Sequence, residues 1–196
     1  MDNDFLNANG VVEQTCSVCG EQLTKFGSKQ LKDGILCRNC AKLASEWLTD
    51  EDYLNMSIED MKNHLQYRKD NSEKVKAFKA SKVIEGKYSL YIDDDNKQFL
   101  FSKRKDLIKD NPDVIDYADL KEISVYEQQY LKEKTFDIFF SAELGNKQLS
   151  HLDLRVNEFP GLDRDTKEFK EASEIALAYL DALVAQDDLE LELEED

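Results

Sequence analysis

Apolar and polar residues alternate with a period of two through much of the chain after residue 83. The alternating apolar positions are Tyr88, Leu90, Ile92, Phe99, Phe101, Ile123, Val125, Phe136, Ile138, Phe140, Leu152, Leu154 and Val156. Such alternation is typical of strands that bury one face. Turn-forming residues at 93–96 and at Gly145-Asn146 separate neighbouring strands, and Pro160-Gly161 ends the series. The pattern predicts about six or seven antiparallel strands.

Helical spacing occurs on both sides of this β region. Ser57 is a candidate N-cap, and the apolar residues at 58, 61 and 65 then follow one helical stripe. We expect a break in this helix at Asn71-Ser72. Near the C-terminus, Asp165 is the expected cap of a long amphipathic helix. Its apolar face comprises Phe169, Ala172, Ile175, Ala176, Tyr179, Leu180 and Leu183. We expect this helix to cover the open apolar side of the strands.

These patterns divide the 196-residue chain into five parts. We predict a flexible tail at 1–14, a four-cysteine module at 15–48, a helical connector at 49–80, a β domain with its C-terminal helix at 81–186 and an acidic tail at 187–196. The predicted fold class is α+β, in which an antiparallel β-sandwich or half-barrel is closed by the C-terminal helix.

Charge narrows the range of partners. The formal net charge is -16, residues 81–196 contribute -14 of it, and residues 181–196 contain eight acids and no base. An acidic surface repels nucleic acid and anionic lipid, and it attracts basic partners. No apolar run approaches the ~20 residues of a membrane span. The acidic N-terminus is unlike a signal peptide. We therefore expect a cytoplasmic protein without a membrane span.

The four cysteines form two pairs of equal spacing, Cys16-x2-Cys19 and Cys37-x2-Cys40. In a reducing compartment such pairs indicate a metal site rather than disulfides. Zinc favours four tetrahedral ligands, and thiolates suit it. Because all four ligands come from the protein, no coordination position is left for water. We predict one zinc ion, Zn2+, with a structural role.

The residues around the two pairs indicate how the module folds. Gly20 permits a positive φ directly after the first pair, and Asp33-Gly34 gives a hairpin tip between the pairs. The second pair opens a predicted helix from Cys37 to Trp47. This order is typical of a treble-clef-like or ribbon-like zinc module.

Residues 34–40, Gly-Ile-Leu-Cys-Arg-Asn-Cys, resemble the GATA-type zinc finger, a family that binds DNA through its helix and a basic extension. The extension here, residues 45–52, is acidic. Phe26-Gly27 stand where basic residues are expected near the hairpin. The resemblance therefore implies a metal site but not DNA binding.

Residues 16–20 and 31–40 together resemble a short zinc-ribbon domain of unknown function from low-GC Gram-positive bacteria and their phages. In that family the ribbon commonly precedes a stretch similar to residues 92–95 and 114–123, which looks like a bacterial pleckstrin-homology-like (PH-like) domain. The resemblance spans most of residues 15–185. It implies a zinc ribbon followed by a PH-like domain and an origin in a phage or mobile element, and it brings no known activity.

The sequence contains no recognisable catalytic pattern. The only histidines, His64 and His151, are interpreted as polar surface or interface residues, and there is no nucleophile elbow or Gly-rich phosphate loop. The acids at 93–95 are interpreted as a turn, and the bases at 103–105 as a solvated loop. We expect no enzyme activity.

The function expected from these observations is that of a binding or adaptor protein. Its partner is expected to be another protein, and a basic or nucleic-acid-binding one would suit the acidic regions. The alternative is a nucleic-acid-binding regulator that uses the zinc module, because residues 15–43 hold five bases against two acids. An enzyme with an unrecognised site is the third hypothesis.

Overall fold

The computed structural model describes residues 5–6, 12–24, 26–129 and 134–191. The chain divides into two compact units, Met1–Asp70 and Asn71–Asp196, called unit 1 and unit 2 below. The division falls within helix α3 (Ile58–Ala77) and not near residue 80. Among the described residues, no helix is both long enough and apolar enough to cross a membrane.

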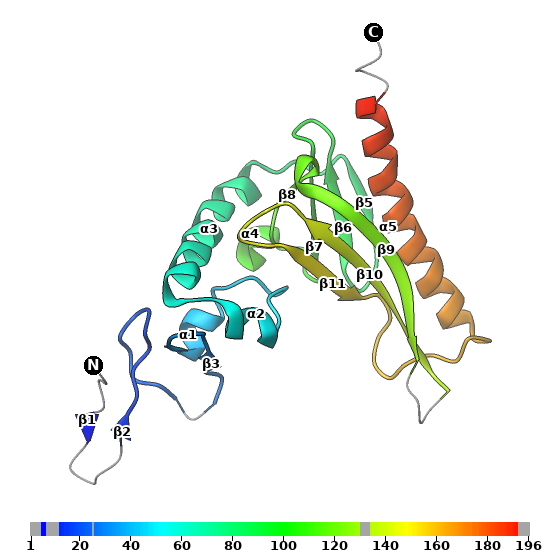
Figure 1. The fold of residues 1–196 in the computed structure, drawn as a ribbon. Coiled ribbons are helices and arrows are strands. Elements are labelled where there is room, and N and C mark those ends of the chain that lie inside the picture. The colour runs from blue at the N-terminus through cyan, green and yellow to red at the C-terminus, as the bar shows by residue number, and fades with distance from the viewer. Residues whose placement is uncertain (1–4, 7–11, 25, 130–133, 192–196) are drawn as a thin grey trace. The chain divides into compact units, whose positions relative to one another are not determined.

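Unit 1 consists of short strands and helices (Figure 1). Its elements are β1 (Phe5–Leu6), β2 (Val12–Glu13), β3 (Lys29–Gln30), β4 (Ile35–Leu36), α1 (Arg38–Ala41), α2 (Asp50–Asn55) and the first part of α3. β1 pairs antiparallel with β2, so the expected tail at 1–14 contains paired strands. β3 pairs with β4 around the expected Asp33-Gly34 tip.

Helix α1 is much shorter than the helix expected from Cys37 to Trp47. The chain leaves the helical path after Ala41. The backbone N–H of Ser45 then donates to Nε2 of His64 on α3 at 3.0 Å, and the N–H of Trp47 donates to Ser45 Oγ at 3.2 Å. These side-chain acceptors replace the carbonyls that a longer helix would use.

The core of unit 1 is built around the cysteines and continues past residue 48. Its buried cluster contains Cys16, Leu31, Leu36, Cys37, Cys40, Ala44, Tyr53 and Met61. Tyr53 comes from α2 and Met61 from α3. The cysteine module therefore needs both helices to close its core, and the expected bound at residue 48 leaves them out.

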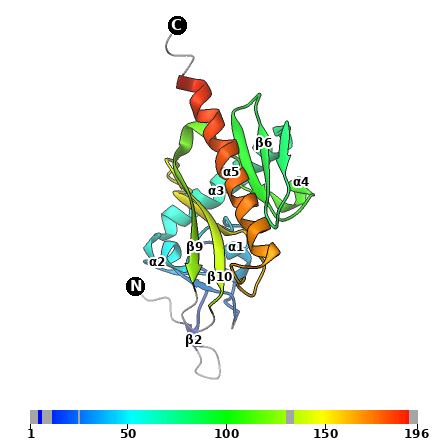
Figure 2. The ribbon, with the colours of Figure 1, turned by 90° about the vertical axis from the view of Figure 1, so that its right-hand side faces the viewer.

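Unit 2 contains two antiparallel sheets and a long C-terminal helix (Figures 1 and 2). Its elements are β5 (Lys82–Ile84), β6 (Ser89–Asp93), β7 (Gln98–Ser102), α4 (Leu107–Asp110), β8 (Ile115–Asp116), the 3-10 helix η1 (Tyr117–Asp119), β9 (Leu120–Gln129), β10 (Phe136–Leu144), β11 (His151–Arg155) and α5 (Lys167–Leu191). One sheet has the order β5-β6-β7-β8 and the other β11-β10-β9. The two sheets are not closed into a barrel.

The alternating apolar residues of both sheets meet α5 in one core. Phe101 of β7, Phe140 of β10 and Tyr179 of α5 contact one another, with ring centroids 5.2 to 6.0 Å apart. The Tyr179 hydroxyl donates to the carbonyl of Tyr88, so this polar group is satisfied inside the core. The predicted α+β class with antiparallel strands and a C-terminal helix is confirmed.

Helix α3 begins as expected but does not break at Asn71. Ser57 Oγ accepts from the N–H of Asp60 at 3.1 Å, and Asp60 accepts in return from the N–H of Ser57 at 2.9 Å. Asn71 is buried, and its amide hydrogen-bonds the loop that contains Pro112 and Val114. Because its side chain binds this loop, it does not compete for the backbone of the helix.

The start and the end of α5 also differ from the expectation. The N–H of Phe169 donates to Thr166 Oγ1 at 3.2 Å, so Thr166 and not Asp165 caps the helix. The N–H of Asp165 instead donates to Asp163 at 3.1 Å. The helix extends to Leu191, into the range expected to be a tail, and residues 192–196 of that tail lie outside the described residues.

Candidate metal centre

The first cysteine pair lies in a tight turn that backbone hydrogen bonds hold closed. The N–H of Gly20 donates to the carbonyl of Cys16, and the N–H of Cys16 donates to that of Glu21, both at 2.8 Å. Gly20 has a φ of +77°, a conformation that residues with a Cβ rarely adopt. The turn brings Cys19 back towards Cys16.

The second pair lies at the start of α1. Cys37 is the N-cap, and its sulfur accepts from the N–H of Cys40 at 3.4 Å. Strand β4 delivers Cys37 to this position. The N–H of Ser17 donates to the carbonyl of Ile35 at 2.8 Å, and the N–H of Ile35 donates to Ser17 Oγ at 3.0 Å. These two bonds fasten the first turn to β4, and so place the two pairs side by side.

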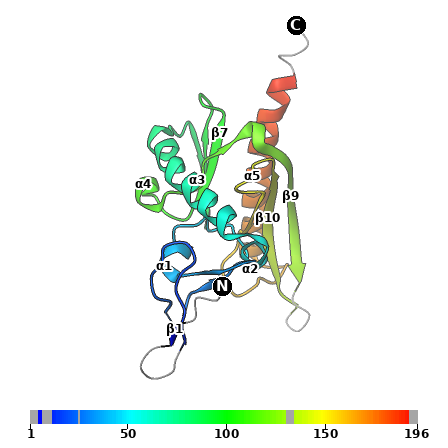
Figure 3. The ribbon, with the colours of Figure 1, turned by 60° about the vertical axis from the view of Figure 1, so that its left-hand side comes forward.

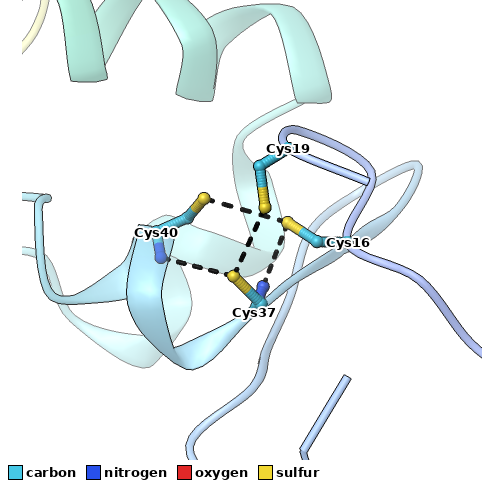
Figure 4. A group of neighbouring side chains, drawn as sticks. All are labelled: Cys16, Cys19, Cys37 and Cys40. Carbon is cyan, nitrogen blue, oxygen red and sulfur yellow. Dashed lines mark hydrogen bonds between the residues drawn. The ribbon is translucent and has the colours of Figure 1, made fainter. Parts of the chain in front are cut away.

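The four sulfurs converge on one point (Figure 4). Cys16 Sγ lies 3.9 Å from Cys40 Sγ, and Cys19 Sγ lies 3.7 Å from Cys37 Sγ. All four lie within 4.8 Å of one another. Tetrahedral zinc with Zn–S bonds of ≈ 2.3 Å would separate its sulfurs by about 3.8 Å. The four cysteines can therefore hold one metal ion, and their spacing is consistent with zinc.

The thiols differ in burial and in protonation. Cys16, Cys37 and Cys40 are buried, whereas Cys19 is exposed. Burial raises the pKa of Cys16, but N–H groups of Cys19, Cys37 and Val18 outweigh it and leave that pKa at about 6. Burial and then the sulfurs of Cys19 and Cys37 raise the pKa of Cys40. Since metal ligation requires thiolates, metal binding must release protons.

Glu21 is a neighbour of the cluster that the sequence did not single out. Its carboxylate accepts from Asn39 Nδ2 at 3.1 Å and lies 4.0 Å from Cys37 Sγ. It thereby links the turn of the first pair to the helix of the second. The sequence offered no signal for this role, because Glu21 is one of 42 acidic residues.

Neither histidine lies in the cluster. His64 is fully buried, where a polar surface or interface residue was expected, because Nε2 accepts the N–H of Ser45 in unit 1. His151 is half-buried on β11 of unit 2. Among the described residues, the four cysteines are the group of ligand-type side chains that could hold a metal ion.

Residues 15–64 match a protein family described as a domain of unknown function (DUF4428). The match contains all four cysteines, α2 and the start of α3. It therefore extends over the same elements as the buried core of unit 1 and agrees with the expected resemblance to a zinc-ribbon family of unknown function. No curated protein and no solved structure matches the chain.

Proposed function

We propose that Cys16, Cys19, Cys37 and Cys40 hold one structural zinc ion. The observation that carries the proposal is the arrangement of the four sulfurs, whose 3.7 and 3.9 Å separations fit the edges of a zinc–thiolate tetrahedron. Four protein ligands complete this coordination. The ion would then hold the module together and would have no open position for a substrate.

Elemental analysis of the purified full chain tests the zinc assignment. We expect about one equivalent of zinc per chain. Cys37→Ser should lose it, because a hydroxyl replaces a thiolate ligand. Thr24→Ala, at an exposed position of the same module, should retain it. Full zinc retention in Cys37→Ser, or a different metal in the native chain, would contradict the assignment.

We further propose that the chain is a non-enzymatic binding or adaptor protein whose partner is another protein with a basic surface. Residues 71–196 contain 30 acids and 18 bases, a net charge of -12, which attracts such a surface over several ångströms. Among its described residues, unit 1 also exposes the large apolar side chains of Phe26, Leu43 and Leu54. Exposed side chains of this kind can add apolar area to a contact with a protein.

Nucleic acid is the less favoured partner. Lys29, one of the five bases in residues 15–43, forms an ion pair with Asp50 at 2.6 Å. Four zinc-bound thiolates would add a net charge of -2, because the ion carries +2. Phosphate binding depends on clustered cations, and both effects reduce the positive charge of the module.

We also propose that unit 2 has a PH-like architecture. Its two antiparallel sheets are followed by one C-terminal helix, and Phe101, Phe140 and Tyr179 join the three elements. These features support the resemblance through residues 92–95 and 114–123. An experimental structure of the chain tests this proposal, and a sheet order other than β5-β6-β7-β8 and β11-β10-β9 would contradict it.

Affinity capture from the native host, followed by mass spectrometry, tests the proposed binding function. We expect to recover a protein with a basic surface. Its capture should persist after nuclease treatment and should be lost at raised salt, because charges drive the contact. Cys37→Ser shows whether unit 1 takes part in the contact. Submicromolar binding to a nucleic acid duplex at physiological salt would favour the regulator instead.

A further inference from the structure

Strand β9 forms one edge of its three-stranded sheet. The sheet has the order β11-β10-β9, so β9 is hydrogen-bonded to β10 on one side only. Figure 3 shows β9 along the rim of this sheet. At ten residues it is the longest strand described in the chain. Its residues are all half-buried or exposed. A long uncovered edge is a template for pairing with another strand.

The contacts of β10 show which backbone groups of β9 face the free edge. The N–H of Ile138 donates to Asn157 Oδ1 and its carbonyl accepts from Val156, both at 2.8 Å, so Ile138 points towards the β11 side. Orientation alternates along an antiparallel strand. The neighbouring residues of β10 therefore point towards β9 and bond to the residues directly opposite them.

Three residues of β9 consequently direct their backbone groups away from the sheet. The residues opposite the β9-facing positions of β10 are Glu122, Ser124, Tyr126 and Gln128. The residues between them, Ile123, Val125 and Glu127, turn their N–H and carbonyl groups to the free edge. Within the described part of unit 2, no hydrogen bond reaches these outward groups.

The regular backbone of this edge is interrupted at one end only. The register with β10 shifts once, between Glu143 and Leu144, which leaves Lys121 as an extra residue of β9. Such a bulge interrupts pairing at that point. From residue 122 to 129 the strand has a regular register with β10 and contains no proline. These eight residues are open to a further strand.

We propose that this edge pairs antiparallel with β9 of a second copy of the chain, around a two-fold axis at Ser124. The two three-stranded sheets would then form one six-stranded sheet. The proposal concerns unit 2 alone and does not depend on the zinc site or on the proposed partner protein.

The side chains of β9 select this register. An axis at Ser124 places Ile123 of each copy opposite Val125 of the other, so the two half-buried apolar residues cover each other. An axis at Val125 would place Ile123 opposite Glu127, and an axis at Tyr126 would place Val125 opposite Glu127. An axis at Ile123 would place Val125 opposite Lys121, the extra residue at the bulge.

Sedimentation of the full chain at physiological salt tests the pairing. The native chain should form a dimer. Ser124→Lys should weaken it by at least about tenfold, because two added charges would meet across the axis. Ser141→Lys is the matched control, since Ser141 lies opposite Ser124 on β10 and one strand further from the edge. It should leave the dimer intact.

A mixture of two variants separates loss of pairing from loss of folding. The Ser124→Lys and Ser124→Glu chains should each be monomeric alone and should form a heterodimer when mixed, because opposite charges then meet at the axis. A native chain that stays monomeric up to about 100 μM overturns the proposal. So does a dimer that Ser124→Lys and Ser141→Lys affect equally, because the edge would then not be the interface.

Hydrogen exchange gives a residue-level readout of the same interface. The amides of Ser124 and Tyr126 should be protected in monomer and dimer alike, since they bond to β10. The amides of Ile123 and Val125 should be protected in the dimer only. If these two amides exchange equally fast in the native chain at high concentration and in Ser124→Lys, β9 is not paired and the proposal fails.

Discussion

The two units of this chain are stabilised in different ways. Three of the eight residues in the buried cluster of unit 1 are cysteines, and its strands are only two residues long. Unit 2 buries long strands and a helix around large aromatic side chains such as Phe101, Phe140 and Tyr179, each at most 1% exposed. The same chain thus combines a core that contains three cysteines with a core of aliphatic and aromatic side chains.

The difference follows from size. A small module buries too little apolar surface to offset the entropy of ordering its chain, so a metal or a disulfide commonly supplies the missing stability. Unit 2 is larger, and besides the core around Tyr179 it buries a cluster of Val75, Leu100 and Val114. We infer that unit 1 depends on a metal ion bound by its four cysteines and that unit 2 does not.

Removal of the metal should unfold unit 1 and spare unit 2. Structural zinc in small finger peptides contributes about 10–16 kcal/mol of apparent binding free energy at pH 7, and this is folding free energy. A strong chelator, or Cys37→Ser, should therefore collapse the amide NMR signals of residues 15–64 into the unfolded range. The signals of β6, β7 and β10 should stay dispersed.

Addition of zinc after chelation is the control for this experiment. It should restore the signals of unit 1 in the native chain but not in Cys37→Ser. Loss of the β10 signals together with those of unit 1 would show that both units unfold as one and that their stability does not have separate origins.

Unit 2 should respond instead to a loss of packing. Leu183 on α5 is fully buried, and Leu183→Ala should lower the free energy of unfolding by roughly 2–5 kcal/mol. Leu177 lies on the same helix but is 51% exposed, so Leu177→Ala should change it by less than about 0.5 kcal/mol. Thermal unfolding of the zinc-loaded chain measures both. Equal effects would mean that α5 does not cover the sheets.

The strands of unit 2 could be predicted because their residues follow a period that depends only on local geometry. Leu90 and Ile92 alternate with Ser89 and Tyr91, and this stretch pairs with the apolar run Phe99–Phe101 as β6 and β7. The limits of the helices could not be found in this way. Asparagine often interrupts helices, yet hydrogen bonds between Asn71 and a loop some forty residues away keep it inside α3. A contact so distant in sequence leaves no local signal.

The metal centre shows the same limit. The spacing of the cysteines predicted that their four sulfurs share one site, and the structure places them within 4.8 Å of one another. The spacing did not reveal that Tyr53 and Met61 complete the core around them. Neither did it show that His64 is buried to hold Ser45. These are long-range contacts, and the residue types alone permit many others.

Asn71 should make a smaller, purely polar contribution to unit 2. It is 1% exposed, its Nδ2 donates to the carbonyl of Pro112 at 2.7 Å, and its Oδ1 accepts from Val114 at 2.9 Å. Asn71→Ala leaves buried backbone groups unpaired and should lower the free energy of unfolding by about 1–3 kcal/mol. Asp70→Ala, at the exposed neighbouring position, is the control and should be nearly neutral. Urea unfolding of the zinc-loaded chain measures both.

Acid should unfold the two units at different pH values. Asp93, at the end of β6, should make only a small contribution to the acid sensitivity of unit 2. Burial raises the pKa of this carboxyl, but hydrogen bonds from Asn96 and from the N–H of Lys79 outweigh it, so that its pKa lies below the usual value. A lowered pKa means that this carboxylate stabilises unit 2 fully above about pH 4, the unfolded value, and less as pH falls through the folded value. One proton changes the free energy of unfolding by at most about 1.4 kcal/mol per pH unit. Asp93→Asn should flatten the acid limb of the stability curve by less than this, and Asp95→Asn, an exposed neighbour, should not flatten it.

Unit 1 should fail at a higher pH, because its metal requires thiolates that acid protonates first. Amide NMR signals followed from pH 7 to pH 3 measure both transitions, and simultaneous loss of the two units would contradict the separate origins of their stability.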